Sequence, residues 1–68
     1  MMDIKVKELV AISASVSVNC HPCFKFHVNK ALENGVSENE IQEAVSIGIM
    51  VRKGVADEMD KLISALIK

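Results

Sequence analysis

The chain contains no Trp, no Tyr and only two Phe, so its core has to be built from small and aliphatic side chains. Neither sign of charge is in excess, since eight basic and nine acidic residues give a net charge of −1. This balance excludes the basic footprint of a nucleic-acid-binding protein. No apolar stretch reaches the ~18 residues that a membrane span needs, and no secretory signal pattern is visible. We therefore expect a cytoplasmic protein that binds neither nucleic acid nor membrane.

Half of the 68 residues are nevertheless apolar, and the mean hydropathy is positive, which excludes a disordered chain. The length predicts a single domain over residues 1–68. A chain this short buries only about 60% of its unfolded surface, and a core of this size rarely supplies more than roughly 3–5 kcal/mol. The two cysteines can add at most one disulfide. Assembly into a homo-oligomer is therefore the expected source of further buried surface.

Local signals mark the ends of several helices. Asn34-Gly35 is typical of a helix end, because Gly tolerates the left-handed conformation that follows the last turn. Ser37-Glu38-Asn39-Glu40 is a capping box that starts the next helix, since the Ser37 hydroxyl can accept from the Glu40 amide and the Glu40 carboxylate from the Ser37 amide. Pro22 suits a first helical turn, where its missing N–H costs little.

Between these signals the apolar residues recur with a helical period. The last segment carries the clearest apolar stripe, formed by Val55, Met59, Leu62, Ile63, Leu66 and Ile67. Residues 4–18 are apolar almost all round, which predicts that a second subunit covers them. Residues 16–18 alternate like a strand, but no second strand signal could pair with them. The sequence therefore predicts an all-α domain of about four helices, at about 3–18, 21–34, 38–52 and 55–67.

One face of the second predicted helix concentrates the reactive side chains. Cys20 and Cys23 are three residues apart and His27 follows Cys23 by four, so both spacings make neighbours on a helix surface. The reactive thiolate is favoured by the positive end of a helix dipole, by a second thiol in Cys-x-x-Cys spacing and by a nearby His. Such a group suits thiol–disulfide exchange, or attack on a weak O–O bond followed by condensation of a sulfenic acid into a disulfide.

Each part of this group also has a less specific interpretation. Cys-x-x-Cys alone is a weak redox signal, and a single His at this spacing is more often a partly exposed helix residue. Cys20, Cys23 and His27 could instead supply three zinc ligands. His21 would be a strained fourth ligand, although structural zinc usually needs a ligand pair more distant in sequence. Phe24 directly after Cys23 excludes a c-type haem, and the missing βαβ pattern disfavours a thioredoxin fold.

Glu8 is the only acidic residue between Asp3 and Glu33. If the first two helices form an antiparallel hairpin, Glu8 lies about three turns from the hairpin end, near the depth of His27 or beyond. A carboxylate there could orient the imidazole and increase its basicity. Spacing alone favours a simpler interpretation, in which Glu8 is a solvated charge beside neighbouring lysines.

Four of these residues, in the run Glu8-x11-Cys20-x2-Cys23-x3-His27, resemble the signature of the alkylhydroperoxidase D-like branch of the carboxymuconolactone decarboxylase family. The flanking segments 18–28 and 31–44 are similar to that branch as well. The likeness covers residues from about 4 to 66, and its four functional positions agree in both residue type and spacing.

The resemblance implies an all-helical domain, completed by assembly into trimers or hexamers, and a thiol-dependent peroxidase or disulfide oxidoreductase that uses no metal or flavin. The substrate would be a hydroperoxide and the reductant a dithiol of the thioredoxin or lipoyl type. Cys23 would correspond to the peroxide-reactive thiol and Cys20 to its disulfide partner. His27 and Glu8 would form a proton relay through water, which favours the functional interpretation of Glu8.

The sequence departs from the family pattern in two ways. Peroxidase members carry a His directly before the second Cys, whereas that position here is Pro22 and His21 lies one place earlier, about 100° around the helix. We therefore do not transfer the role of that His to His21, which is left as a minor contributor to the site. The chain is also shorter than those enzymes, so we expect an open pocket that needs a neighbouring subunit.

The two cysteines are expected to differ in reactivity. The position of Cys20, nearer the helix start, predicts the more exposed thiol with the lower pKa. The resemblance and the spacing of His27 instead favour Cys23 for the first attack on peroxide. We expect Cys20 to be the sulfur that an external dithiol attacks first.

Three other functions stay open. The domain could be a non-enzymatic assembly or redox-sensing module, or it could bind zinc. It could also be a decarboxylase-like enzyme for a small lactone acid. Decarboxylase members lack the cysteine pair, however, and Arg52 is the only Arg from which an anion pocket could be built.

Overall fold

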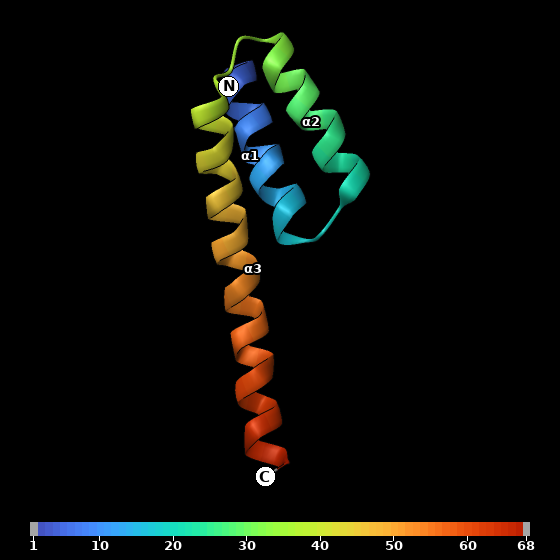
Figure 1. The fold of residues 1–68 in the computed structure, drawn as a ribbon, viewed down its shortest axis with the longest axis vertical. Helices are drawn as coiled ribbons and strands as arrows, with labels where there is room; N and C mark the ends of the chain where they lie inside the picture. Colours follow the sequence, from blue (N-terminus) through green and yellow to red (C-terminus); the bar gives the residue numbers. More distant parts are fainter. Residues whose placement is uncertain (1, 68) are drawn as a thin grey trace.

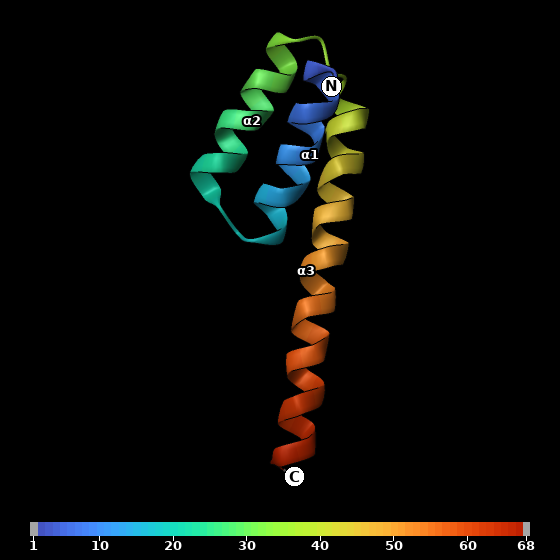
Figure 2. The same cartoon turned by 180° about the vertical axis from the view of Figure 1, so that it is seen from behind.

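Residues 2–67 form three helices, with a short connection between consecutive helices. The computed structural model describes residues 2–67, with α1 at Ile4–Ser17, α2 at His21–Glu33 and α3 at Glu38–Leu66. In Figures 1 and 2, α1 and α2 form an antiparallel hairpin and α1 lies between α2 and α3. No strand occurs among residues 2–67, so the all-α prediction is confirmed.

The connection between α1 and α2 is set by the way α1 ends. Asn19 adopts the left-handed conformation, with a φ of 57°, directly after the C-cap residue Val18. The next amide, of Cys20, donates to the Ser15 carbonyl at 2.9 Å, and the Asn19 amide donates to the Val16 carbonyl at 3.2 Å. These two bonds form a Schellman motif, in which an Asn is an accepted substitute for Gly. The chain therefore turns sharply into α2 at Cys20.

The connection between α2 and α3 confirms the predicted helix signals. Gly35 has a φ of 82° after the C-cap Asn34, and the Val36 amide donates to the Ala31 carbonyl at 3.0 Å. Ser37 then caps α3, since the Glu40 amide donates to the Ser37 hydroxyl oxygen and the Ser37 amide donates to the Glu40 carboxylate, both at 3.2 Å. Both expectations, a Gly-terminated helix and a capping box, therefore hold.

The prediction of about four helices is wrong in one place. The segments expected at 38–52 and 55–67 form one continuous helix of 29 residues, α3. Gly54 lies inside it, with nothing within 4 Å of the place where a Cβ would be. A single Gly in a helix interior costs only about 1 kcal/mol relative to Ala, and no cap or Pro accompanies Gly54 to end the helix. Lys53 and Asp57 form an i,i+4 ion pair at 3.1 Å across the expected break.

The core lies where α1 crosses the first half of α3 and the end of α2. Its buried apolar residues are Ile12, Ala31, Val36, Ile41 and Ala44. Helices α1 and α3 approach closely at Gly48, where an added Cβ would lie 2.6 Å from the Ser13 carbonyl oxygen. The Ser13 hydroxyl also donates to the Ala44 carbonyl at 2.7 Å. Small side chains thus set the spacing of α1 and α3.

The second half of α3 extends beyond the hairpin. The molecule is consequently elongated, with extents of 50 × 23 × 19 Å, and Figure 2 shows the orange and red part of α3 without a neighbouring helix. Every described residue from 53 to 67 is exposed. None of the described helices combines the length and the apolar character needed to cross a bilayer.

Candidate redox site

Cys20 and Cys23 are bonded to each other at the start of α2. Cys20 is the N-cap of the helix, Cys23 lies in its first turn, and their Cα atoms are 5.3 Å apart. Pro22 occupies the first turn as expected, between the two sulfurs in sequence. Because the positive end of a helix dipole favours thiolate over thiol, this position suits a dithiol that is oxidised and reduced by two electrons.

Glu8 and His27 meet across the interface between α1 and α2. The Glu8 Oε1 atom lies 2.8 Å from His27 Nδ1, and Glu8 as a whole is only 8% exposed. The simpler interpretation of Glu8 as a solvated charge is therefore wrong, and the depth expected from an antiparallel hairpin is correct. A carboxylate that accepts from Nδ1–H leaves Nε2 of a neutral imidazole as its basic atom.

The position of His27 on α2 relates it to the disulfide. His27 follows Cys23 by four residues in the same helix, so it lies one turn further along the same face. Its ring packs edge-on against Phe26, with ring centroids 5.0 Å apart. Packing and the bond to Glu8 both orient the imidazole, as a proton-transfer group requires.

The exposure of the two cysteines is the reverse of what the sequence predicts. Cys23 is exposed, whereas Cys20 is half-buried. The reason lies in the Schellman motif, because the backbone of Cys20 is tied to α1 through its bond to Ser15. Nearness to the helix start therefore does not make Cys20 the more accessible sulfur.

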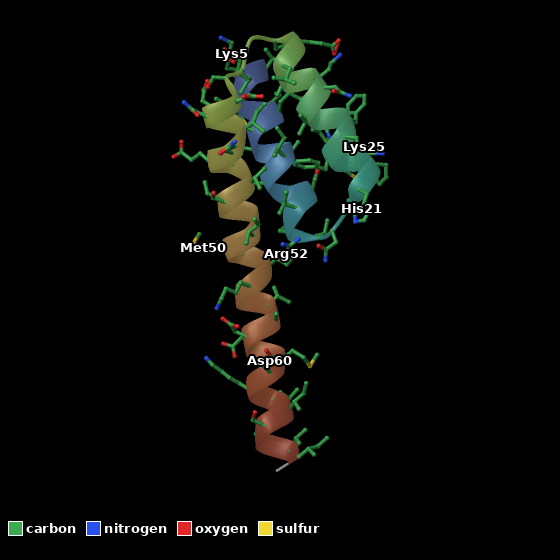
Figure 3. The ribbon with its side chains drawn as sticks, in the orientation of Figure 1. Lys5, His21, Lys25, Met50, Arg52 and Asp60 are labelled. Atoms are coloured by element: carbon green, nitrogen blue, oxygen red, sulfur yellow. A yellow bond between two sulfur atoms is a disulfide. The ribbon has the colours of Figure 1, made fainter. Side chains whose placement is uncertain are left out.

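An open pocket of about 420 Å³ lies beside Cys20 and does not reach Cys23. It is bounded by the end of α1, the first turns of α2 and the middle of α3. Its lining consists of Ser15, Val16, Asn19, Cys20, His21, Phe24, Lys25, Val45, Ile49 and Arg52. Figure 3 labels its three basic residues, with His21 and Lys25 on α2 and Arg52 on α3.

Arg52 and Asn19 belong to this site although the sequence analysis gave neither a role in it. The Arg52 guanidinium donates to Asn19 Oδ1 at 2.8 Å, so one residue of α3 stabilises the loop that positions Cys20. An Asn directly after the C-cap of a helix, like Asn19 after Val18, is a recognisable signal of the left-handed conformation. No local signal predicts Arg52, because its contact spans 33 residues in sequence.

The candidate zinc ligands do not form a metal-binding group. Among residues 2–67, no three His, Cys, Asp or Glu side chains come together in such a group. The two sulfurs are bonded to each other, and His27 is bonded to Glu8. His21 is exposed and lines the pocket beside Cys20, where no third metal-binding side chain of the described residues joins the two.

Comparison with known proteins identifies the family. An uncharacterized protein of Cupriavidus necator is 33% identical over 49 residues, which are 72% of this chain and 43% of that protein. The chain thus spans less than half the length of this curated relative. No solved structure matches this chain. The profile of the carboxymuconolactone decarboxylase family matches residues 2–64. With its three helices and paired cysteines, the chain therefore belongs to the carboxymuconolactone decarboxylase family.

Proposed function

We propose that the protein is a thiol-dependent peroxidase, a disulfide oxidoreductase of the alkylhydroperoxidase D type, that reduces hydroperoxides in the cytoplasm as part of antioxidant defence. The observation that carries the proposal is the pairing of a Cys20–Cys23 bridge with a Glu8–His27 hydrogen bond one helical turn away. Family membership is compatible with such redox chemistry.

In the proposed cycle, Cys23 is the thiol that reacts with peroxide. His27 accepts the proton of the Cys23 thiol, with Glu8 orienting its ring. The thiolate attacks one oxygen of the hydroperoxide, the O–O bond breaks, and the other oxygen leaves as an alcohol after it receives a proton. The sulfur becomes a sulfenic acid. The Cys20 thiolate then attacks this sulfur, water leaves, and the bridge forms.

A dithiol completes the cycle by reducing the bridge. One of its thiolates attacks a sulfur of the bridge and forms a mixed disulfide, and its second thiol releases the oxidised dithiol. The protein regains two thiols, so each turnover transfers two electrons from the dithiol to the peroxide. We assign this role to a thioredoxin- or lipoyl-type dithiol and involve no metal or flavin.

A thiol count tests the cycle directly. The reduced protein is treated with one equivalent of hydroperoxide, and its free thiols are counted before and after. We expect the loss of two thiols per chain without cross-links between chains. In Cys20→Ser, a sulfenic acid should accumulate on Cys23. Mass spectrometry that finds a sulfenic acid in Cys23→Ser alone would contradict the assignment of Cys23.

Three further measurements separate the alternative functions: peroxide turnover, zinc content and lactone decarboxylation. A purely structural or redox-sensing module would show no sustained consumption of peroxide when an excess of dithiol is present, whereas the peroxidase would, and Cys23→Ser would abolish it. A zinc-binding module would contain about one zinc per chain and resist alkylation. A lactone decarboxylase would retain its activity in Cys20→Ser.

We also propose that the protein functions as a homo-oligomer, a trimer or a hexamer. The support comes from the second half of α3, where the predicted apolar stripe has no partner within the described part of the chain. We call this set the C-terminal stripe: Val55, Met59, Leu62, Ile63, Leu66 and Ile67. Each is between 49% and 75% exposed. Isolated apolar side chains are common on surfaces, but a contiguous row of this kind is typical of an interface.

A further inference from the structure

The pocket beside Cys20 differs from the Glu8–His27 side of the site in both access and charge. It reaches one sulfur of the bridge, Cys20, and none of its lining residues is Cys23, His27 or Glu8. A molecule bound in this pocket would therefore meet the bridge from the Cys20 side. The exposed Cys23 is left for a second reactant.

The polar part of the pocket is basic. Arg52, Lys25 and His21 contribute to its wall, and no Asp or Glu does. Within residues 2–67, none of these three basic side chains forms an ion pair. The contacts of Arg52 are neutral oxygens, since its guanidinium donates to Asn19 Oδ1 and to the Val16 carbonyl. The positive charge of the pocket is thus not neutralised by the protein itself.

The remainder of the wall is apolar. Four side chains, of Val16, Phe24, Val45 and Ile49, line it together with Cys20. An aliphatic segment can be buried against them, as in most ligand sites that combine apolar walls with a few polar groups. Apolar wall, sulfur and guanidinium occur together in this one pocket.

We infer that this pocket binds a small thiol that carries a carboxylate on an aliphatic stem, and that it directs the sulfur of this thiol to Cys20. The inference rests on the proposed redox function, because it concerns the step that reduces the bridge. The carboxylate pairs with Arg52, whose planar guanidinium matches it in shape, Lys25 adds positive charge nearby, and the His21 ring supplies a hydrogen-bonding nitrogen.

The chemical step balances as a thiol–disulfide exchange. The ligand thiolate attacks Cys20 Sγ, a new S–S bond forms, and the bond between Cys20 and Cys23 breaks. Cys23 leaves as a thiolate in the first turn of α2, where the helix dipole stabilises it. A second thiol, which in a dithiol reductant belongs to the same molecule, attacks the ligand sulfur of the mixed disulfide and releases Cys20 as a thiolate, so that two thiols are oxidised to one disulfide and the protein gains two electrons.

The test compares thiols that differ only in the terminal charge. The oxidised protein is mixed with mercaptohexanoate or mercaptohexanol at equal thiolate concentration and low salt. Acid-quenched samples are analysed by mass spectrometry for the mixed disulfide and the reduced protein. We expect mercaptohexanoate to react about 1.5 to 5 times faster, the range for one solvent-screened charge pair. The first adduct should lie on Cys20, and the preference should decrease at high salt.

Variants of α3 assign the preference to the pocket. Arg52→Gln should remove most of it, while Arg52→Lys should retain part of it. Lys53→Gln is the matched control, because it removes one positive charge from the next residue of α3, which does not line the pocket. Circular dichroism confirms that each variant is folded. The inference would be overturned if wild type reacted with the two thiols at equal rates. It would also be overturned if Arg52→Gln and Lys53→Gln lost the preference for mercaptohexanoate to the same extent.

Failure of the pocket inference can be distinguished from failure of the proposed peroxidase function. If the bridge is reduced with the expected preference but the dithiol form does not consume peroxide, the inference stands and the peroxidase proposal fails. If no thiol reduces the bridge, the proposed cycle fails. The charge selectivity of the pocket is then measured on the oxidised protein by NMR. Larger chemical-shift changes at the pocket residues with hexanoate than with hexanol support the inference, and equal changes contradict it.

Discussion

The Glu8 carboxylate hydrogen-bonds to His27 Nδ1 and so connects α1 with α2 through a nearly buried acid. We predict that Glu8→Gln slows oxidation of the reduced protein by hydroperoxide about tenfold to a hundredfold, because a neutral amide orients the ring without stabilising its charged form. Loss of a positioned general base itself costs ~10²–10⁴. Stopped-flow measurement of thiol loss checks this value.

Glu33→Gln is the control for this variant, since it removes an exposed acid from the end of α2. It should react with peroxide at the wild-type rate. A Glu8→Gln protein that is folded and fully active would show that the carboxylate has only a structural role.

The two glycines of α3 should respond to Ala in opposite directions. At Gly48 a Cβ would lie 2.6 Å from the Ser13 carbonyl oxygen, so α1 and α3 must separate, and we expect a loss of about 1–3 kcal/mol. At Gly54 nothing lies within 4 Å, so Ala should stabilise the helix by up to about 1 kcal/mol. Urea denaturation of both variants measures the difference, and equal effects would contradict the close approach at Gly48.

The capping box of α3 should contribute a pH-dependent part of the stability. We expect Ser37→Ala to lower the free energy of unfolding by about 1 kcal/mol at neutral pH. Hydrogen bonds from Ser37 lower the pKa of Glu40 below its usual value of 4.5. Since the folded pKa is the lower one, the stabilisation is complete above the unfolded pKa and decreases as the pH falls through the folded one.

Denaturation of wild type and Ser37→Ala at several pH values tests this dependence. The stability difference between the two proteins should shrink below about pH 4.5. Ser46→Ala serves as the control, because Ser46 is exposed within α3 and its hydroxyl only donates to the Gln42 carbonyl. A stability difference that stays constant down to strongly acid pH would show that the ionised Glu40 carboxylate does not contribute to the capping box.

The C-terminal stripe should determine the oligomeric state. Leu62 lies at the centre of the stripe and is 53% exposed. We expect Leu62→Asp to give a monomer, because a charge cannot be buried in an apolar interface without a partner. Light scattering after size-exclusion chromatography measures the mass. Asp60→Asn, on the same part of α3 but outside the stripe, should leave the assembly intact. Two variants of equal mass would argue against the stripe as the interface.

Much of the fold could be predicted because its signals are local. Gly35, Ser37 and Glu40 act through neighbours within five residues, and each is found at the expected helix end. The depth of Glu8 follows from the same logic, since a hairpin with a short loop determines which turns face each other. These features depend on the backbone more than on the surroundings.

The features that the sequence analysis missed depend on distant contacts or on weak signals. The side chain of Arg52 bonds to Asn19 across 33 positions, and the reversed exposure of the cysteines depends on how α1 ends. The helix end expected near residue 52 is absent although Gly54 lies there, because helix propensity alone is too small a term to end a helix. A Gly marks a helix end only when capping bonds accompany it, as they do at Gly35.

The unpartnered half of α3 has a consequence for how proteins of this kind diversify. Among residues 53–67, none lines the pocket or is hydrogen-bonded to Glu8 or His27. Changes in the last four turns would therefore act on the proposed assembly and leave the residues of the proposed redox site untouched. Under the proposed function, natural selection would adjust quaternary structure and catalysis through separate sets of mutations.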